Sequence, residues 1–324
     1  MINFTNAKEE FNKYKGSEKK KTLIYNQKKY LVKFPDPVSG KNKNISYINN
    51  AFSEYVGSNI LKLTGFETQN TILGEYEYKG KEKIVCACED FTDSKNVLYE
   101  FENLALSTNP DKKIGTELSE IMEIIEENKM INAEETKEKF WNMFVIDALI
   151  GNTDRHNGNW GFLLDLESGK VKFAPIYDCG SCLNPMLEDN EIEKIGSTEI
   201  HNVSINCYSC IKENNKKINY MTYIKQMKNE ECNKAIIRIF PNMDIEKIND
   251  FIENISYISD IRKSFYKEII KTRYEIVKSA YKKLKKAWQS MGNYSIIIFV
   301  TRRSQNFSPY LNKEKGWKLN RYKL

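Results

Sequence analysis

The chain has 324 residues, of which 40% are hydrophobic and 29% are charged, a balance that excludes a disordered or fibrous protein. Its longest apolar run near the C-terminus, residues 296–300, is far too short to span a membrane. The net charge of +6 is uneven, because residues 261–324 hold 17 Lys and Arg against 3 Asp and Glu and the first 260 residues carry −8. This basic C-terminal region predicts an acidic partner or polyanion, although a solvated helix face explains the same charge.

The start of the chain and its cysteines favour a cytoplasmic protein. The first residues, MINFTNAKEEF, lack the apolar segment of a secretory signal. The seven Cys are irregularly spaced, which favours a reducing compartment. We therefore expect no transmembrane segment and a cytoplasmic location, with export that needs no signal as an open alternative.

The N-terminal part is predicted to be rich in strands. Two apolar runs, residues 22–25 and 30–34, predict a hairpin whose second strand Pro35 ends. Apolar residues near helical spacing predict a helix over residues 47–64, with Gly65 as its stop. Residues 71–78 and 83–88 predict two further strands.

From about residue 115 the pattern becomes mostly helical. A helix is predicted from the candidate N-cap Asn132 to Ile150, and a hairpin over residues 160–177 follows the polar stretch GNTDRHNGN. A long helix is predicted from about residue 261 to 291, with Trp288 on its core-facing side. The chain is therefore predicted to be α+β, with a small N-lobe over residues 1–92 and a helical C-lobe over residues 93–324.

The polar stretch contains a pair of residues with the spacing that kinases use. Phosphoryl transfer needs a carboxylate to orient the attacking hydroxyl and oxygen ligands to hold a metal ion on the phosphates. Protein kinases supply these groups as Asp-x-x-x-x-Asn after a helix and as an Asp-x-Gly motif after a short hairpin. Asp154 and Asn159 have the first spacing, and Asp178 begins Asp-Cys-Gly after the predicted hairpin.

A lysine and a glutamate further upstream complete this set. Lys33 lies in a predicted strand, and Glu54 lies in the following predicted helix, where the two can form the ion pair that kinases use. Taken singly, each residue is explained as well by a solvated strand position or an exposed helix position. Their order along the chain and their predicted elements together indicate a phosphotransferase.

These motifs resemble those of the HipA-type serine/threonine kinases. The resemblance covers about residues 16–185 and rests on GNTDRHNGNWGF, the downstream YD-x-GS, and the upstream YLVKFP and CEDF. It implies a bilobal protein-kinase-like fold with a small antiparallel β-rich N-lobe, ATP with Mg²⁺ or alternatively Mn²⁺, and a protein substrate with a Ser or Thr hydroxyl. The phosphatidylinositol 4-kinase superfamily is more distantly similar.

The resemblance also implies individual roles. Asp154 would be the catalytic base, Asn159 and Asp178 the magnesium ligands, and Lys33 the phosphate-binding lysine. Glu89 and Phe91 would lie at the adenine.

The segment KGSEKKKT resembles the phosphate loop of this family and contains a single glycine, Gly16. Ser17 and the amides that follow it would cradle phosphate, although a charged turn explains the segment as well. Ser17 and Thr22 are candidates for autophosphorylation because they flank this loop.

His156 lies two residues beyond Asp154 and is a second candidate for the base or for a nucleotide contact. We favour a supporting role, in which a hydrogen bond from or to its ring fixes the loop.

Two Cys-x-x-Cys pairs, which begin at Cys179 and Cys207 with 24 residues between them, have the pattern of a four-thiolate zinc site. The first pair directly follows Asp178, where zinc thiolates and magnesium ligands would compete for space. We therefore favour unbonded, partly buried cysteines.

Two other classes of function stay open at this level. The distant similarity to phosphoinositide kinases and the basic C-terminal region fit a lipid kinase at an anionic membrane. The lysine-rich KKLKK also fits a non-catalytic module that binds nucleic acid.

Overall fold

The computed structural model describes residues 2–11, 19–35, 49–108, 110 and 114–303, with side chains up to residue 290. Gly16 and Ser17 lie outside these residues. Met1–Tyr281 forms one compact unit, and a second unit begins at Lys282 within the last helix. In the part of the chain that the structure describes, no helix is both long enough and apolar enough to cross a lipid bilayer.

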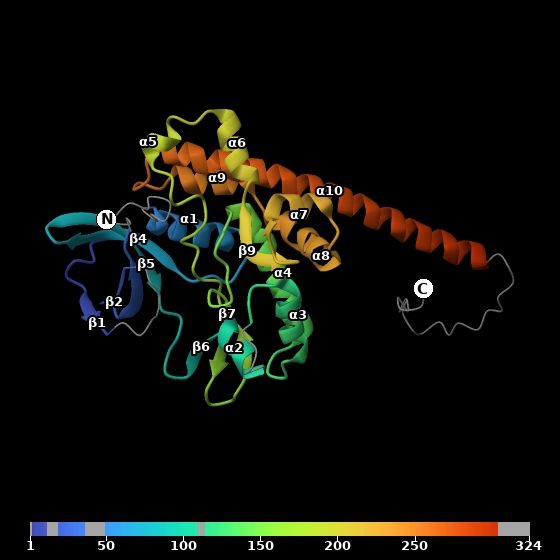
Figure 1. Cartoon of the computed structure of the whole chain (residues 1–324), viewed down its shortest axis with the longest axis horizontal. Coiled ribbons are helices and arrows are strands. Elements are labelled where there is room, and N and C mark those ends of the chain that lie inside the picture. The colour runs from blue at the N-terminus through green and yellow to red at the C-terminus, as the bar shows by residue number, and fades with distance from the viewer. Residues whose placement is uncertain (1, 12–18, 36–48, 109, 111–113, 304–324) are drawn as a thin grey trace. The chain divides into compact units, whose positions relative to one another are not determined.

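The first part of the compact unit is an antiparallel sheet with the strand order β1-β2-β3-β5-β4 (Figure 1). Its strands are β1 (Lys8–Glu10), β2 (Lys20–Tyr25), β3 (Lys28–Lys33), β4 (Thr71–Tyr78) and β5 (Lys81–Glu89). The predicted hairpin is β2–β3, whose turn places Asn26 and Gln27 at φ of 47° and 63°, conformations that asparagine tolerates better than most residues. Apolar side chains on the sheet form a buried cluster, made by Phe4, Leu23, Tyr30, Val32, Phe34, Tyr76, Val85 and Ala87.

Helix α1 (Asn50–Leu63) packs against β4 and β5. It buries Val56, Ile60 and Leu61, and the chain leaves it through Gly65 at φ +88°, a conformation that favours glycine. The predicted helix is thus confirmed, except that residues 47 and 48 lie outside the described residues.

Helix α4 (Ala133–Ile150) lies at the centre of the second part. Asn132 caps it, because its side-chain oxygen accepts from the backbone N–H of Glu135 at 3.0 Å, and Gly151 ends it at φ +68°, which confirms both predicted ends. Its C-terminal half is buried on all sides, as expected for a run without a polar face. The other helices are α2 (Phe101–Thr108), α3 (Leu118–Glu127), α5 (Asp189–Ile192), α6 (Ser197–Ile205), α7 (Tyr220–Gln226), α8 (Glu230–Ile239), η2 (Phe240–Asn242), α9 (Ile245–Glu253) and α10 (Asp260–Arg303).

Two small sheets complete the compact unit. Strands β6 (Asn96–Glu100), β7 (Gly161–Asp165) and β8 (Val171–Phe173) form one sheet, and β9 (Tyr208–Glu213) and β10 (Lys216–Asn219) form a hairpin. The predicted hairpin over residues 160–177 is confirmed as β7–β8, but β8 ends at Phe173, shortly before Pro175, which has no N–H to donate. The β9–β10 hairpin was not predicted.

The last helix is longer than predicted. Phe265, Ile269 and Val277 of α10 are buried as expected. The prediction for Trp288 was wrong, since its side chain is 54% exposed. The compact unit ends at Tyr281, and Trp288 belongs to the second unit.

The cap of α4 gives a test of this architecture. Asn132→Ala removes the acceptor of the Glu135 N–H, so we expect the free energy of unfolding to fall by about 1 kcal/mol in urea denaturation. Asn132→Asp retains an acceptor and should keep nearly the wild-type value. Equal losses in both variants would contradict the assigned cap.

Candidate active site

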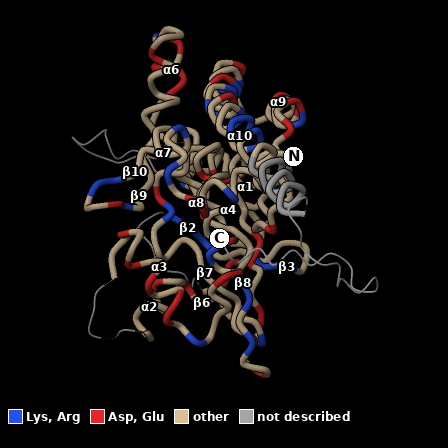
Figure 2. Tube along the Cα trace, turned by 90° about the vertical axis from the view of Figure 1, so that its right-hand side faces the viewer, with Lys and Arg blue, Asp and Glu red and all other residues tan. Residues whose placement is uncertain are grey.

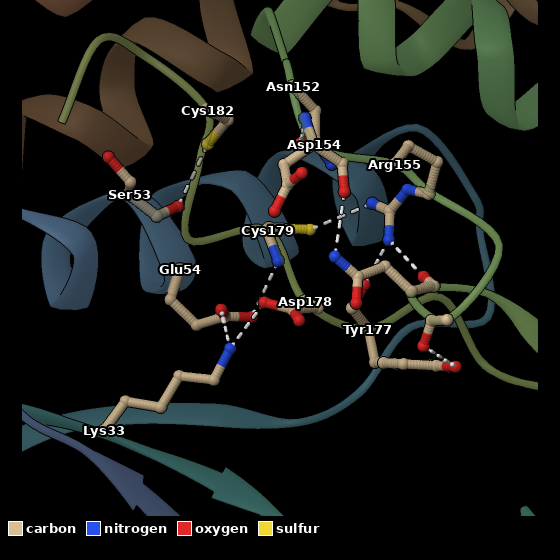
Figure 3. A network of polar contacts seen from close by, with 12 residues as sticks. Lys33, Ser53, Glu54, Asn152, Asp154, Arg155, Tyr177, Asp178, Cys179 and Cys182 are labelled. Atoms are coloured by element: carbon tan, nitrogen blue, oxygen red, sulfur yellow. Dashed lines mark hydrogen bonds and ion pairs between the residues drawn. The ribbon is translucent and has the colours of Figure 1, made fainter. Parts of the chain in front are cut away.

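A buried lysine joins the strand-rich part to the helical part of the compact unit (Figure 3). Lys33, the last residue of β3, donates from Nζ to Oε2 of Glu54 at 2.6 Å and to Oδ1 of Asp178 at 2.7 Å. Glu54 is fully buried and Lys33 is 6% exposed, so each charge depends on its partner for the solvation that it has lost. The structure therefore brings together three residues that lie far apart in the sequence, including the expected pair of Lys33 and Glu54.

Glu54 also holds the backbone after Asp178. Its Oε1 accepts from the N–H of Cys179 at 3.0 Å. Gly57, one helical turn further along α1, permits this approach, because a Cβ at that position would lie 2.7 Å from Sγ of Cys182. Asp178 itself has a φ of +58°, an uncommon conformation for a residue with a side chain.

The loop between α4 and β7, residues 151–160, is here called the Asp154 loop. The carbonyl oxygen of Asp154 accepts from Nδ2 of Asn159 and from the N–H of His156, both at 2.8 Å. Because Nδ2 of Asn159 is engaged, its Oδ1 is the atom left to bind a cation. Nδ1 of half-buried His156 accepts from the N–H of Gly158 at 3.0 Å, so its ring fixes the loop in the way the sequence analysis favoured.

Arg155 connects the elements around this loop, although no motif in the sequence indicated it. Its guanidinium is 1% exposed and pairs through Nε with Oδ2 of Asp147 on α4 at 2.9 Å. It also donates to the carbonyl oxygens of Asn159, at 2.6 Å, and of Tyr177. A carboxylate inside the apolar run FVIDALI was the available signal, since a buried charge needs a partner.

The pKa of Asp154 is raised, whereas the pKa of Asp178 is lowered. Burial raises the pKa of Asp154, and the charge of Asp178 adds to this against the effects of His156 and Arg155. Burial alone would raise the pKa of Asp178 as well, but the adjacent Lys33 outweighs it and holds the pKa of Asp178 below its ordinary value. Asp178 thus stays ionised beside a cation, whereas Asp154 is better suited to accept a proton.

The residues expected at the adenine lie at the end of β5. Glu89 pairs with Lys28 at 2.8 Å, and its carbonyl oxygen accepts from Nε2 of Gln69 at 3.0 Å. Phe91 is half-buried, and the centroid of its ring lies 5.8 Å from that of Tyr177. No hydrogen bond or ion pair between described residues links Glu89 or Phe91 directly to Lys33, Glu54 or Asp178. The assignment of Glu89 and Phe91 to the nucleotide therefore stays a prediction.

None of the seven cysteines forms a disulfide, and six of them are buried. Within the first pair, Sγ of Cys179 lies 3.7 Å from Nη2 of Arg155, and Sγ of Cys182 contacts the carbonyl oxygen of Ser53 at 3.1 Å. Among the described residues, no group of three or more His, Cys, Asp or Glu is placed to hold a metal ion. The two Cys-x-x-Cys pairs therefore do not form a four-thiolate group here.

The donors at the site suit a hard divalent cation. Oδ1 of Asp178 accepts a hydrogen bond from Lys33, which leaves Oδ2 to bind a metal. Asn159 can bind the metal through Oδ1, because its Nδ2 donates to the carbonyl oxygen of Asp154. Magnesium prefers such oxygen ligands, takes only one or two of them from the protein and receives the rest from water and phosphate. The residues present therefore fit a metal bound together with a nucleotide.

Comparisons with known proteins found four informative similarities. A model of the HipA-like C-terminal domain family matches residues 13–247. The serine/threonine-protein kinase CtkA of Helicobacter pylori is 40% identical over 283 residues, which cover 84% of this chain and 85% of that protein. The crystal structure of a Helicobacter pylori proinflammatory kinase CtkA matches with a TM-score of 0.80 and 37% identity, over 88% of this chain and 98% of that one. HipA of Shewanella oneidensis, solved with HipB and operator DNA, matches in fold alone, with a TM-score of 0.50 and 14% identity over 81% of this chain and 66% of that chain.

The buried ion pair behind the Asp154 loop gives the test for this site. Asp147→Asn leaves the guanidinium of Arg155 buried without its counter-charge, so we expect a loss of about 3–5 kcal/mol in the free energy of unfolding. Glu135→Gln on the same helix removes an exposed pair with Lys139 and should cost less than about 1 kcal/mol. Urea denaturation compares the two variants, and a loss for Asp147→Asn no larger than for Glu135→Gln would refute the structural role.

Proposed function

The chain belongs to the family of proteins with a HipA-like C-terminal domain, and from this membership and the geometry of its site we propose that it is an ATP-dependent serine/threonine protein kinase. The observation that carries the proposal is the convergence of Lys33, Glu54 and Asp178 beside Asp154 and Asn159. A relative named as a serine/threonine-protein kinase is 40% identical to this chain over 283 residues, and this supports the same activity.

In the proposed reaction, the carboxylate of Asp154 orients the Ser or Thr hydroxyl of the acceptor and takes its proton. The hydroxyl oxygen forms a bond to the γ-phosphorus, the bond from that phosphorus to the bridging oxygen breaks, and ADP leaves with the electron pair. Lys33 neutralises phosphate oxygens, and Glu54 holds its ammonium group in place. The chain contributes mainly position and charge, which are the main sources of catalysis in phosphoryl transfer.

We propose Mg²⁺ as the divalent metal, with Mn²⁺ as an alternative, held by Asn159 and Asp178. When bound, the metal neutralises charge on the phosphates and fixes their orientation. Glu89 and Phe91 are proposed to contact the adenine, and Gly16 and Ser17 the phosphates. The supporting observation for Phe91 is its contact with Tyr177, whose hydroxyl donates to the carbonyl oxygen of Gly158 in the Asp154 loop.

Two further assignments are proposed for the chain as a whole. Residues 1–92 would form the N-lobe and residues 93–324 the C-lobe. The division is supported by the order of the elements, since the five-stranded sheet and α1 lie before residue 92 and the helices around α4 lie after it. The lysines at the start of the second unit, which are exposed, support an acidic partner; they are Lys282, Lys283, Lys285 and Lys286.

Loss of single carboxylates tests the proposed function. Asp154→Ala and Asp178→Ala should each lower kcat by about 10²–10⁴-fold, because each removes a group that acts on the reacting atoms. Asp260→Ala, whose side chain is 96% exposed at the start of α10, should keep wild-type activity. The assay follows transfer of the γ-phosphate of ATP to protein and, separately, to inositol lipid. Full activity in either site variant, or transfer to lipid alone, would refute the proposal.

Autophosphorylation gives a second test. We expect mass spectrometry after incubation with ATP and Mg²⁺ to find phosphate at Ser17 and none at Thr22. The hydroxyl of Thr22 lies in β2, where the residue is only 2% exposed, so a reaction there would require part of the sheet to open. The Asp178→Ala variant serves as the control and should gain no phosphate. Phosphate on Thr22 alone, or on neither residue, would contradict this expectation.

A further inference from the structure

The β9–β10 hairpin is fixed beside the Asp154 loop at its base. Tyr220, which directly follows β10, donates from its hydroxyl to the carbonyl oxygen of Asn152 at 2.8 Å. Asn152 in turn accepts from the N–H of Asp154 through its side chain at 3.2 Å. Tyr220 is fully buried, so the base of the hairpin and the loop have a fixed spacing.

A short segment ahead of α3 fixes the hairpin from the other side. The carbonyl oxygen of Gly115 accepts from Nδ2 of Asn157 in the Asp154 loop at 2.7 Å. The next residue, Thr116, bonds to β9 twice: its hydroxyl donates to the carbonyl oxygen of Cys210, and its own carbonyl oxygen accepts from the N–H of Lys212, each at 2.8 Å. The segment therefore lies between the loop and the hairpin and is bonded to both.

One face of this hairpin is basic and open to solvent. Along β9, Ser209 and Ile211 are buried, whereas Tyr208 and Lys212 are exposed, which is the alternation of a strand with one covered face. Lys217 of β10 stands directly opposite Lys212 and is also exposed. Figure 2 shows lysines along this hairpin, which is labelled β9 and β10.

The two lysines place like charges directly opposite each other. Like charges directly opposite each other destabilise an antiparallel ladder. In the part of the chain that the structure describes, neither ammonium group forms an ion pair with a carboxylate, in contrast to Lys33 and Lys28. A positively charged face of this kind is complementary to an acidic partner.

The same face belongs to the hairpin that Tyr220 and Thr116 hold beside the Asp154 loop. Lys217 lies on this face because it pairs directly with Lys212, and half-buried Cys210 lies on it because it is two residues before Lys212 in β9.

We propose that this outward face is the docking surface for the acceptor segment of the protein substrate, and that Lys212 and Lys217 bind Asp or Glu side chains that flank the acceptor hydroxyl. The inference rests on the proposed kinase function and names its substrate class. The surface is fixed to the loop that carries Asp154, so an acidic side chain held on the two lysines would place the neighbouring hydroxyl at that carboxylate.

Matched peptides test the proposal. Wild-type protein should phosphorylate a Ser peptide flanked by Glu with a kcat/KM about 3- to 20-fold above that of the same peptide with Gln, since two exposed ion pairs contribute modestly. The double variant Lys212→Gln, Lys217→Gln should lose this preference while its kcat/KM for the Gln peptide is retained. Lys216→Gln is the control, because that exposed lysine stands opposite Glu213 on the same hairpin and on the other face. High salt should reduce the preference in wild type.

Charge reversal and binding separate this inference from the proposed function. The variant Lys212→Glu, Lys217→Glu should prefer a peptide flanked by Lys. Fluorescence anisotropy should show tighter binding of the Glu peptide than the Gln peptide to wild type, with the difference lost in the double Gln variant. Binding of this kind without any phosphate transfer would refute the kinase proposal and retain the docking surface. Transfer with equal kcat/KM for both peptides, or a double Gln variant that changes KM for ATP instead, would overturn the docking surface.

Discussion

A buried guanidinium is stable only where its charge and its donors are matched, and the site of this protein is arranged around Arg155. Its counter-ion, Asp147, comes from α4, and its other partners are the carbonyl oxygens of Asn159 and Tyr177 and, at 3.7 Å, Sγ of Cys179. The helix, the Asp154 loop and the segment that leads to Asp178 are therefore held by one side chain. Asp154 directly precedes Arg155 in the chain. Its position therefore follows from the buried ion pair between Arg155 and Asp147.

The strand-rich part is joined to this arrangement by Glu54. One of its oxygens holds Lys33 on the sheet, and the other accepts from the N–H of Cys179, so a single buried carboxylate sets the distance between β3 and the Asp178 backbone. The approach of α1 that makes this possible depends on Gly57, because a larger residue there would meet the side chains of Cys179 and Cys182. The first Cys-x-x-Cys pair is thus explained as small buried side chains under a helix.

The sequence could indicate residues that lie close together in the chain because of local structure. It could not indicate residues that come into contact only when the elements pack together. Asp154 and Asn159 share one loop, and Asn132 and Gly151 mark helix ends, so short patterns predict them. The pairing of Asp147 with Arg155 depends on which side of α4 the loop folds against, and the buried C-terminal half of that helix has no periodicity that reveals it. The β9–β10 hairpin was missed because only Ser209 and Ile211 mark its buried face in β9, although Asn214-Asn215 is a recognisable turn signal.

That hairpin also shows how the fold tolerates an unfavourable charge pair. Its turn places Asn214 and Asn215 at φ of 55° and 63°, and both of their N–H groups donate to the carboxylate of Glu117, at 2.6 and 3.1 Å. Charge-assisted hydrogen bonds of this kind are stronger than neutral ones, so they offset the repulsion between Lys212 and Lys217. The register that sets the two lysines opposite each other is therefore held from the turn, by the same Glu117 whose backbone pairs with Lys212 in an isolated β-bridge.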